Sequence, residues 1–191
     1  MNSKKIFSIT LCGVFAALTA VGAQISMATP SGVNFTLQMF VIAIFSYALS
    51  PAEAVKTTAV YIALGAIGLP VFTNFAGGPA VLAGPTGGFI WGFLIYSLLC
   101  SVKPSSSHSR LISVGLGVLG TVICHLMGVI QYCLYKGDKS FAEGLLLVSL
   151  PFIVKDLVLT AAAYGISIPI KKMTDRARAS LGARRRADSA S

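Results

Sequence analysis

The sequence predicts an all-α membrane protein with six transmembrane helices, a Gly/Pro-rich outer loop and both termini in the cytoplasm. Composition is the first reason: 55% of the 191 residues are hydrophobic and 11% are charged, which leaves too little polar surface to cover a soluble domain. The second is residues 64–92, an uncharged stretch rich in Gly and Pro between long apolar segments. Irregular backbone at membrane depth is tolerated only where protein buries it or where it lines a cavity. This stretch therefore predicts a small-molecule site within the membrane domain.

Six apolar segments approach the roughly 20 residues that a membrane-spanning helix needs. The first begins near the N-terminus, but its apolar run is longer than that of a signal peptide, so we expect it in the mature protein. The second is short for a span, and the third and fourth flank the Gly/Pro-rich stretch. The fifth contains His125, and the sixth starts at Pro151, which suits the first turn of a helix. The predicted spans are residues 6–27, 35–49, 52–69, 86–102, 111–134 and 151–170.

The placement of Lys and Arg predicts which side of the membrane each end occupies. One side has only Lys136 and Lys139, in a short loop. The other, which we assign to the cytoplasm with both termini, has Lys4, Lys5, Lys103, Arg110, Lys171, Lys172, Arg176, Arg178, Arg184, Arg185 and Arg186. The net charge of +9 thus reflects topology and attraction to anionic lipid, and no nucleic-acid partner is expected, since no aromatic residue is interleaved with the arginines near the C-terminus. We expect a membrane domain over residues 1–172 and a basic cytoplasmic tail over residues 173–191.

Motifs of the common enzymes are missing from the sequence. There is no Walker A sequence, no HExxH, no GxSxG, and no pair of acidic residues within one apolar segment, so the chain is predicted not to be an enzyme and not to hydrolyse ATP unaided. The four cysteines fall in apolar segments without metal spacing, and we interpret them as small core residues. His125 is expected to form an interhelical hydrogen bond, with a catalytic or metal role as the alternative. His108 is expected to be solvated.

Asp156 is the polar residue that most strongly indicates a site. With Pro151 at the helix start, Lys155 and Asp156 lie about 6–9 Å from the outer end, where charges are costly unless they pair or face a polar cavity. One alternative is ligand binding. The others are pairing with other helices and extension of Lys155 toward the interface. Because adjacent helical residues point about 100° apart, the two are not expected to pair with each other.

Small residues recur at every fourth position of the first predicted span. The pairs Gly13/Ala17 and Ala16/Ala20 give a smooth face that lets another helix approach closely. We expect this face to bind a partner subunit.

The most specific pattern in the chain is GLPVF at residues 68–72 followed by GPTGG at residues 84–88. Further features are FTLQ at residues 35–38, Tyr61 to Gly65, Gly77-Gly78, Phe89, Gly92-Phe93 and PFI at residues 151–153 with Asp156. Together these residues resemble the BioY family, the biotin-specific substrate-binding subunits of energy-coupling factor transporters, and the resemblance covers residues 6–170.

The resemblance implies a six-helix protein in the prokaryotic cell membrane that binds biotin near its outer face. It also implies a transmembrane coupling subunit, which would contact Ala16 and Ala20, and two ATPase subunits. No cofactor or metal is implied besides the ligand biotin. The implied ligand-binding residues are Asp156, Asn74, Gln38, Lys155, Phe72, Gly77, Gly78, Gly84, Pro85, Thr86, Gly87, Gly88 and Tyr61.

The chemistry of biotin suits these residues, although which group meets which end of the ligand stays open. The ureido ring needs an acceptor and a donor, and the carboxylate needs a cation or free backbone N–H groups, as at the start of the fourth span. Apolar walls are expected from Phe72, Phe75, Phe89, Tyr61 and Trp91. A solitary biotin facilitator and a binder of another small vitamin acid remain alternatives.

The sequence departs from the family pattern at one place. The family has a lysine three residues after the aspartate, where this chain has Leu159. Lys155 faces within about 40° of that position on a helix, displaced about 6 Å toward the outer end. Lys155 is therefore a candidate to replace the familiar lysine.

Overall fold

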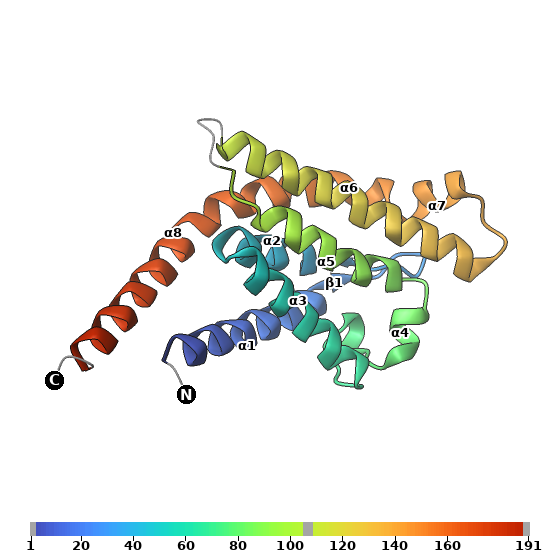
Figure 1. Ribbon diagram of the computed structural model, residues 1–191. Coiled ribbons are helices and arrows are strands. Elements are labelled where there is room, and N and C mark those ends of the chain that lie inside the picture. The colour runs from blue at the N-terminus through green and yellow to red at the C-terminus, as the bar shows by residue number, and fades with distance from the viewer. Residues whose placement is uncertain (1–2, 105–108, 189–191) are drawn as a thin grey trace.

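The computed structural model describes residues 3–104 and 109–188, and these form a bundle of helices with a small hairpin at one end (Figure 1). The elements are α1 (Ser3–Gln24), β1 (Ser26–Met27), β2 (Phe35–Thr36), α2 (Gln38–Ala48), α3 (Pro51–Ala66), η1 (Thr73–Phe75), α4 (Pro79–Ala83), α5 (Gly87–Ser101), α6 (Ser109–Lys136), α7 (Phe141–Val148) and α8 (Leu150–Asp188). Strands β1 and β2 pair antiparallel. His108 lies outside the described residues.

Each of the six predicted apolar segments contains a helix, but the helices differ in length. In the described part of the chain, α1, α6 and α8 are long and apolar enough to cross a membrane. α2 and α5 are shorter apolar helices, and α3 has 16 residues. α2 is shorter than predicted because Phe35 and Thr36 pair with β1 instead of starting the helix. Likewise α1 ends at Gln24, since Ser26 and Met27 form the partner strand.

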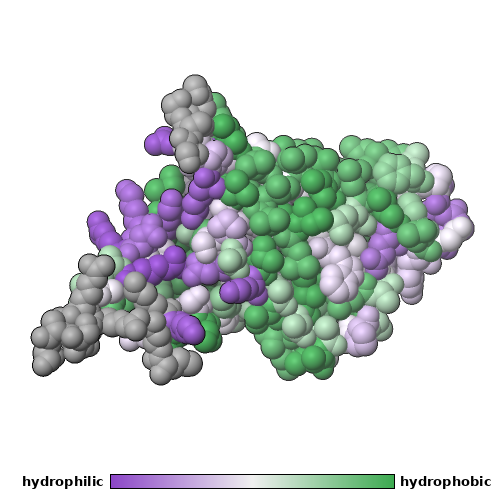
Figure 2. All heavy atoms as spheres, viewed as in Figure 1, coloured by the Kyte–Doolittle hydropathy of each residue, from purple (hydrophilic) through white to green (hydrophobic). Residues whose placement is uncertain are grey.

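Hydrophobic residues form a band across the middle of the molecule, with hydrophilic residues at both ends (Figure 2). The long helices run along the long axis of the molecule. Both termini lie at one end, and the hairpin, η1, α4 and α7 lie toward the other (Figure 1). The band is what a membrane protein requires, because lipid replaces water around its middle. We call the end with the termini the terminal end and the opposite one the cavity end.

The helix α8 extends beyond the predicted span. It continues through Pro169 to Asp188, where Lys, Arg and Ala are good helix formers. Near the terminal end, Arg178 contacts Glu53 of α3 at 2.8 Å, and Ser8 of α1 donates to the same carboxylate at 3.0 Å. These contacts connect α8 to α3 and α1.

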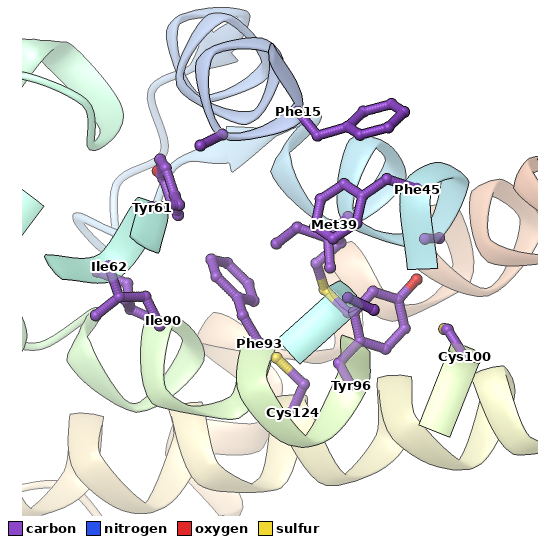
Figure 3. Packing of buried hydrophobic residues seen from close by; sticks show 14 of the residues in the cluster. Phe15, Met39, Phe45, Tyr61, Ile62, Ile90, Phe93, Tyr96, Cys100 and Cys124 are labelled. Carbon is purple, nitrogen blue, oxygen red and sulfur yellow. The ribbon is translucent and has the colours of Figure 1, made fainter. Parts of the chain in front are cut away.

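The core contains side chains of α1, α2, α3, α5 and α6 (Figure 3), together with Leu82 of α4 and Ala163 of α8. Phe15 of α1 packs on Phe45 of α2 with ring centroids 5.5 Å apart. Cys100 and Cys124 are buried and free, which confirms the prediction that they are small core residues. α5 and α6 approach closely because Gly92 lies against Cys124, where a Cβ would collide with the backbone.

The partner face predicted on α1 is divided by the structure. Ala16 is 3% exposed and belongs to the core, so the expectation that it faces outward is wrong. Ala20 is partly buried and packs against this core. Gly13 and Ala17 are exposed, and Gly13 has no atom within 4 Å of its Cβ direction. The smooth outward surface of α1 is therefore formed by Gly13 and Ala17.

Candidate functional site

A cavity of about 390 Å³ lies at the cavity end, enclosed by the helix ends and by three connecting segments. This volume is within the range of small-molecule sites. Most of its wall is apolar, and its polar groups come from separate elements. The residues that line it are Gly32, Val33, Asn34, Thr36, Gln38, Met39, Phe72, Thr73, Asn74, Ala76, Ala80, Val81, Gly84, Pro85, Thr86, Phe89, Ile90, Phe93, His125, Tyr135, Val148, Phe152, Lys155 and Asp156.

The Gly/Pro-rich segment folds into a compact cover over one side of this cavity. Gly78, at φ 96°, donates its N–H to the carbonyl of Gly65 at 2.7 Å. Gln24 of α1 connects this cover to the helix bundle: its Nε2 donates to the Phe72 carbonyl and its Oε1 accepts from the Phe75 N–H, both at 3.0 Å. The segment between α3 and α5, which contains the short helices η1 and α4, is thus anchored to two helices, as the prediction of a cavity-lining loop requires.

Asp156 and Lys155 form an ion pair, contrary to the expectation that neighbours on a helix would not pair. Lys155 Nζ lies 2.9 Å from Asp156 Oδ1. The flexible lysine chain bends across the roughly 100° between the two positions. Asp156 is 5% exposed, so a compensating cation is needed where its carboxylate is buried. The contact lacks hydrogen-bond alignment, and Oδ1 has no hydrogen-bond partner within the described ranges.

Lys155 is held by strand β2 of the hairpin. Its Nζ donates to the Thr36 carbonyl at 2.7 Å and lies 4.0 Å from the centre of the Phe35 ring. Phe35 in turn packs against Phe152 of α8. Lys155 therefore lines the cavity and does not extend to the interface.

His125 forms interhelical hydrogen bonds, as predicted. Its Nε2 lies 3.2 Å from Asp156 Oδ2 on α8, and its Nδ1 lies 3.1 Å from Ser149 Oγ. Within residues 3–104 and 109–188, no group of three His, Cys, Asp or Glu side chains could hold a metal ion.

Gln38 and Tyr61 form a second polar group. Gln38 Nε2 donates to the Tyr61 hydroxyl at 2.7 Å, and that hydroxyl donates to the Val71 carbonyl at 2.9 Å. Gln38 Oε1 accepts from Thr36 at 2.9 Å. Gln38 lines the cavity, whereas Tyr61 does not and instead fixes the amide of Gln38.

The structure brings together eight of the thirteen predicted ligand-binding residues as cavity lining: Asp156, Asn74, Gln38, Lys155, Phe72, Gly84, Pro85 and Thr86. Gly77, Gly78, Gly87 and Gly88 are outside the lining, as is Tyr61. Gly87 and Gly88 pack against Gln131 and Met127 of α6, and the Gly87 N–H donates to the Gly84 carbonyl. The expectation that the Gly87 N–H is free for a carboxylate is therefore wrong. These glycines are needed for close packing.

The aromatic walls also differ in part from those predicted. Phe72 and Phe89 line the cavity, but Phe75 is 70% exposed and Trp91 is 42% exposed, and neither lines it. The sequence reasoning missed Phe93, Phe152 and the turn with Val33. Phe152 directly follows Pro151 and precedes Asp156 by four residues. Residues four apart lie on the same face of a helix, so this spacing could have indicated that Phe152 and Asp156 face the same cavity.

Comparison with known proteins places the chain in a family. A biotin transporter BioY from Thermotoga maritima is 37% identical over 164 residues, which cover 84% of this chain and 94% of that protein. A probable biotin transporter BioY from Pyrococcus horikoshii is 35% identical and covers 83% and 93%. The crystal structure of an S-component for biotin from an ECF-type ABC transporter superposes with a TM-score of 0.80 at 22% identity, over 90% of this chain and 94% of that one, and so shares the fold. The BioY family model matches residues 1–176, and the chain therefore belongs to the BioY family.

Proposed function

We propose that this membrane protein binds biotin in the cavity and takes part in biotin uptake. The observation that carries the proposal is the buried carboxylate of Asp156 in a mostly apolar cavity: its Oδ1 is buried beside Lys155 Nζ and has no hydrogen-bond partner among the residues that the structure describes. A ureido N–H fits such an acceptor, while the thiophane ring and valeryl chain fit the walls of Phe72, Phe89 and Phe93. The relatives' names point to the same ligand.

The polar side chains of Asp156, Lys155 and Asn74 give the cavity its selectivity in this proposal. Asp156 accepts from the ligand, and Lys155 adds a positive charge beside it. The amide of Asn74 offers a further donor and acceptor at the cover. Biotin presents two N–H donors, a carbonyl acceptor and a carboxylate, which makes it complementary to this set.

The topology follows from the charge distribution. We place six membrane-spanning helices, α1, α2, α3, α5, α6 and α8, with the terminal end in the cytoplasm and the cavity at the outer face. The basic residues gathered at the terminal end support this orientation. The shorter α2 packs against α1 and α8, and the shorter α5 packs against α6, so each has a longer apolar helix as a neighbour.

The energy for uphill uptake comes from outside the chain in this proposal, because its sequence has no Walker A motif. A transmembrane coupling subunit and two ATPase subunits supply it. The coupling subunit contacts α1 at Gly13 and Ala17, the small residues that remain exposed. A solitary facilitator is the alternative.

Thermal unfolding of the purified protein with excess ligand tests the binding proposal. Biotin is expected to raise the melting temperature, because a ligand that binds only the folded state stabilises it by mass action. Riboflavin and thiamine are the controls and should have no effect. A shift with another vitamin and none with biotin would refute the assignment.

The partnership is tested by the replacements Gly13→Trp and Ala17→Trp, with Leu18→Trp as the matched control on the same helix. Co-purification with the coupling subunit should be lost for the first two, because close helix approach tolerates only small side chains. Biotin binding should persist in all three. Uptake by vesicles that contain only this chain would instead favour the solitary facilitator.

A further inference from the structure

Three buried polar side chains form a chain of contacts that ends at the cavity. Ser149 lies at the junction of α7 and α8 and is 1% exposed, and His125 of α6 is 2% exposed. Ser149 Oγ is 3.1 Å from His125 Nδ1, and His125 Nε2 is 3.2 Å from Asp156 Oδ2. We propose that His125 is a positioning residue that orients the Asp156 carboxylate toward a ligand N–H, with Ser149 fixing the state of the imidazole. This inference rests on the proposed function.

The acceptor character of a carboxylate determines where the imidazole proton lies. An ionised Asp156 can only accept, so His125 Nε2 must carry a hydrogen and donate it to Oδ2. In the neutral ring Nδ1 then has a lone pair, and the hydroxyl of Ser149 donates to it. The other neutral tautomer would place the lone pair of Nε2 against the carboxylate. The carboxylate therefore selects this tautomer, and the Ser149 hydroxyl stabilises it by donating to Nδ1.

The hydrogen bond at Oδ2 leaves the other oxygen for the ligand. Oδ1 is next to Lys155 Nζ at 2.9 Å, yet it has no hydrogen-bond partner in the part of the chain that the structure describes. If Oδ2 were released, the carboxylate could rotate about its terminal torsion, which has a broad energy profile. When Oδ2 is fixed, less conformational entropy is lost on binding, because Oδ1 already points in one direction toward the ligand.

Packing keeps the imidazole itself in place. The rings of Phe89 on α5 and His125 pack edge to face, with centroids 5.6 Å apart and an interplanar angle of 88°. Phe89 is in turn confined by Gly128, where any Cβ would collide with the phenyl ring. His125 is thus held by an aromatic neighbour, a hydroxyl and a carboxylate from three different segments.

A double-mutant cycle with biotin tests the positioning role. In the parent protein, His125→Ala is expected to weaken biotin binding by roughly 10- to 150-fold, as for loss of a hydrogen bond to a charged group. In the Asp156→Asn background the same change should cost less than about 2-fold, because His125 acts through the carboxylate. His125→Gln, whose amide can donate to Oδ2, should recover part of the affinity, and His125→Leu should not.

The matched control is Thr121→Val, one turn earlier on α6. Thr121 is buried and its hydroxyl is 3.1 Å from that of Thr160, but it does not line the cavity. This change is expected to lower the melting temperature and leave the biotin dissociation constant unaltered. The dissociation constant therefore separates positioning from a general loss of helix packing.

Ser149→Ala provides a smaller change in case His125→Ala does not fold. It should weaken biotin binding by a few-fold in the parent, and it should have no effect in the Asp156→Asn background. Equal losses from the His125 changes in both backgrounds would show that His125 contacts the ligand itself and would overturn the proposal. Unaltered affinity in His125→Ala would also overturn it.

The ligand-free protein separates failure of this inference from failure of the proposed function. If the parent binds no biotin, the proposed function is refuted. The melting temperatures of the parent, His125→Ala, Asp156→Asn and the double variant still test the contact between His125 and Asp156. Non-additive losses from His125→Ala and Asp156→Asn would support a hold on the carboxylate. Additive losses would reject it.

Discussion

The ion pair between Lys155 and Asp156 should determine the stability of the cavity end. Lys155→Met keeps most of the length of the side chain and removes its charge, so Asp156 remains buried beside His125 alone. Removing one partner of a buried pair costs about 3–5 kcal/mol, because the other charge is left uncompensated. We take about 3 kcal/mol here, since His125 still donates to Oδ2.

For a chain of this length, 1 kcal/mol corresponds to a shift of about 2–4 °C in melting temperature. Lys155→Met should therefore melt about 6–12 °C below the parent in mild detergent. The double change Lys155→Met with Asp156→Asn removes the uncompensated charge and should recover much of this loss. Leu159→Lys in the Lys155→Met background should also recover part, because position 159 is on the same face of α8 one turn on.

The assay is thermal unfolding of the ligand-free proteins, followed by a biotin titration of each. If Lys155→Met melted with the parent, Lys155 would not be compensating Asp156. A double mutant that melts as low as Lys155→Met would refute the argument as well, since the loss would then come from the contacts of Lys155 with Thr36 and Phe35.

Two further predictions concern packing and capping. Gly65→Ala should lower biotin affinity, measured by calorimetry, because its Cβ would collide with the ring of Phe72 and push it into the cavity; unaltered affinity would show that the ring gives way elsewhere. Hydrogen bonds from the backbone and hydroxyl of Ser140 hold the pKa of Glu143 below its usual value. The stabilisation that the ionised Glu143 side chain gives to the start of α7 is therefore complete above the ordinary carboxyl pKa, and it is lost as the pH falls through the lowered pKa. Amide exchange in α7 should therefore accelerate at acid pH. Ser140→Ala removes the hydroxyl but keeps the backbone N–H, so it should reduce this pH dependence without abolishing it; exchange independent of pH in the parent, after correction for intrinsic rates, would contradict the prediction.

The positions of the helices could be predicted from the sequence because hydrophobicity alone determines them. Long apolar runs gave α6 and the membrane part of α8 to within a few residues. The limits of α1 and α2 were less accurate, since Ser26 pairs with Thr36 in a hairpin of two-residue strands. So short a pairing has no periodicity that a sequence could reveal.

Most of the predicted site residues whose side chains carry chemistry line the cavity, whereas four of the five predicted glycines do not. Asp156 and Gln38 line the cavity, as a polar group within an apolar segment implied. Gly87 and Gly88 instead serve the contact between α5 and α6. A glycine that approaches a ligand and one that approaches a helix look alike in sequence, because both roles need only the absence of a Cβ.

Lys155 illustrates why a charge near a site need not be available to a ligand. One of its N–H groups donates to the Thr36 carbonyl, its charge pairs with the Asp156 carboxylate, and the face of the Phe35 ring lies against the ammonium. Little of the ammonium is therefore left for a ligand carboxylate. Since Lys155 also cancels the charge of Asp156, the pair adds little net field to the cavity. Selectivity for an anionic ligand must therefore come from directed hydrogen bonds in an apolar enclosure, and this places the demand on the orientation of Asp156 rather than on the number of cations.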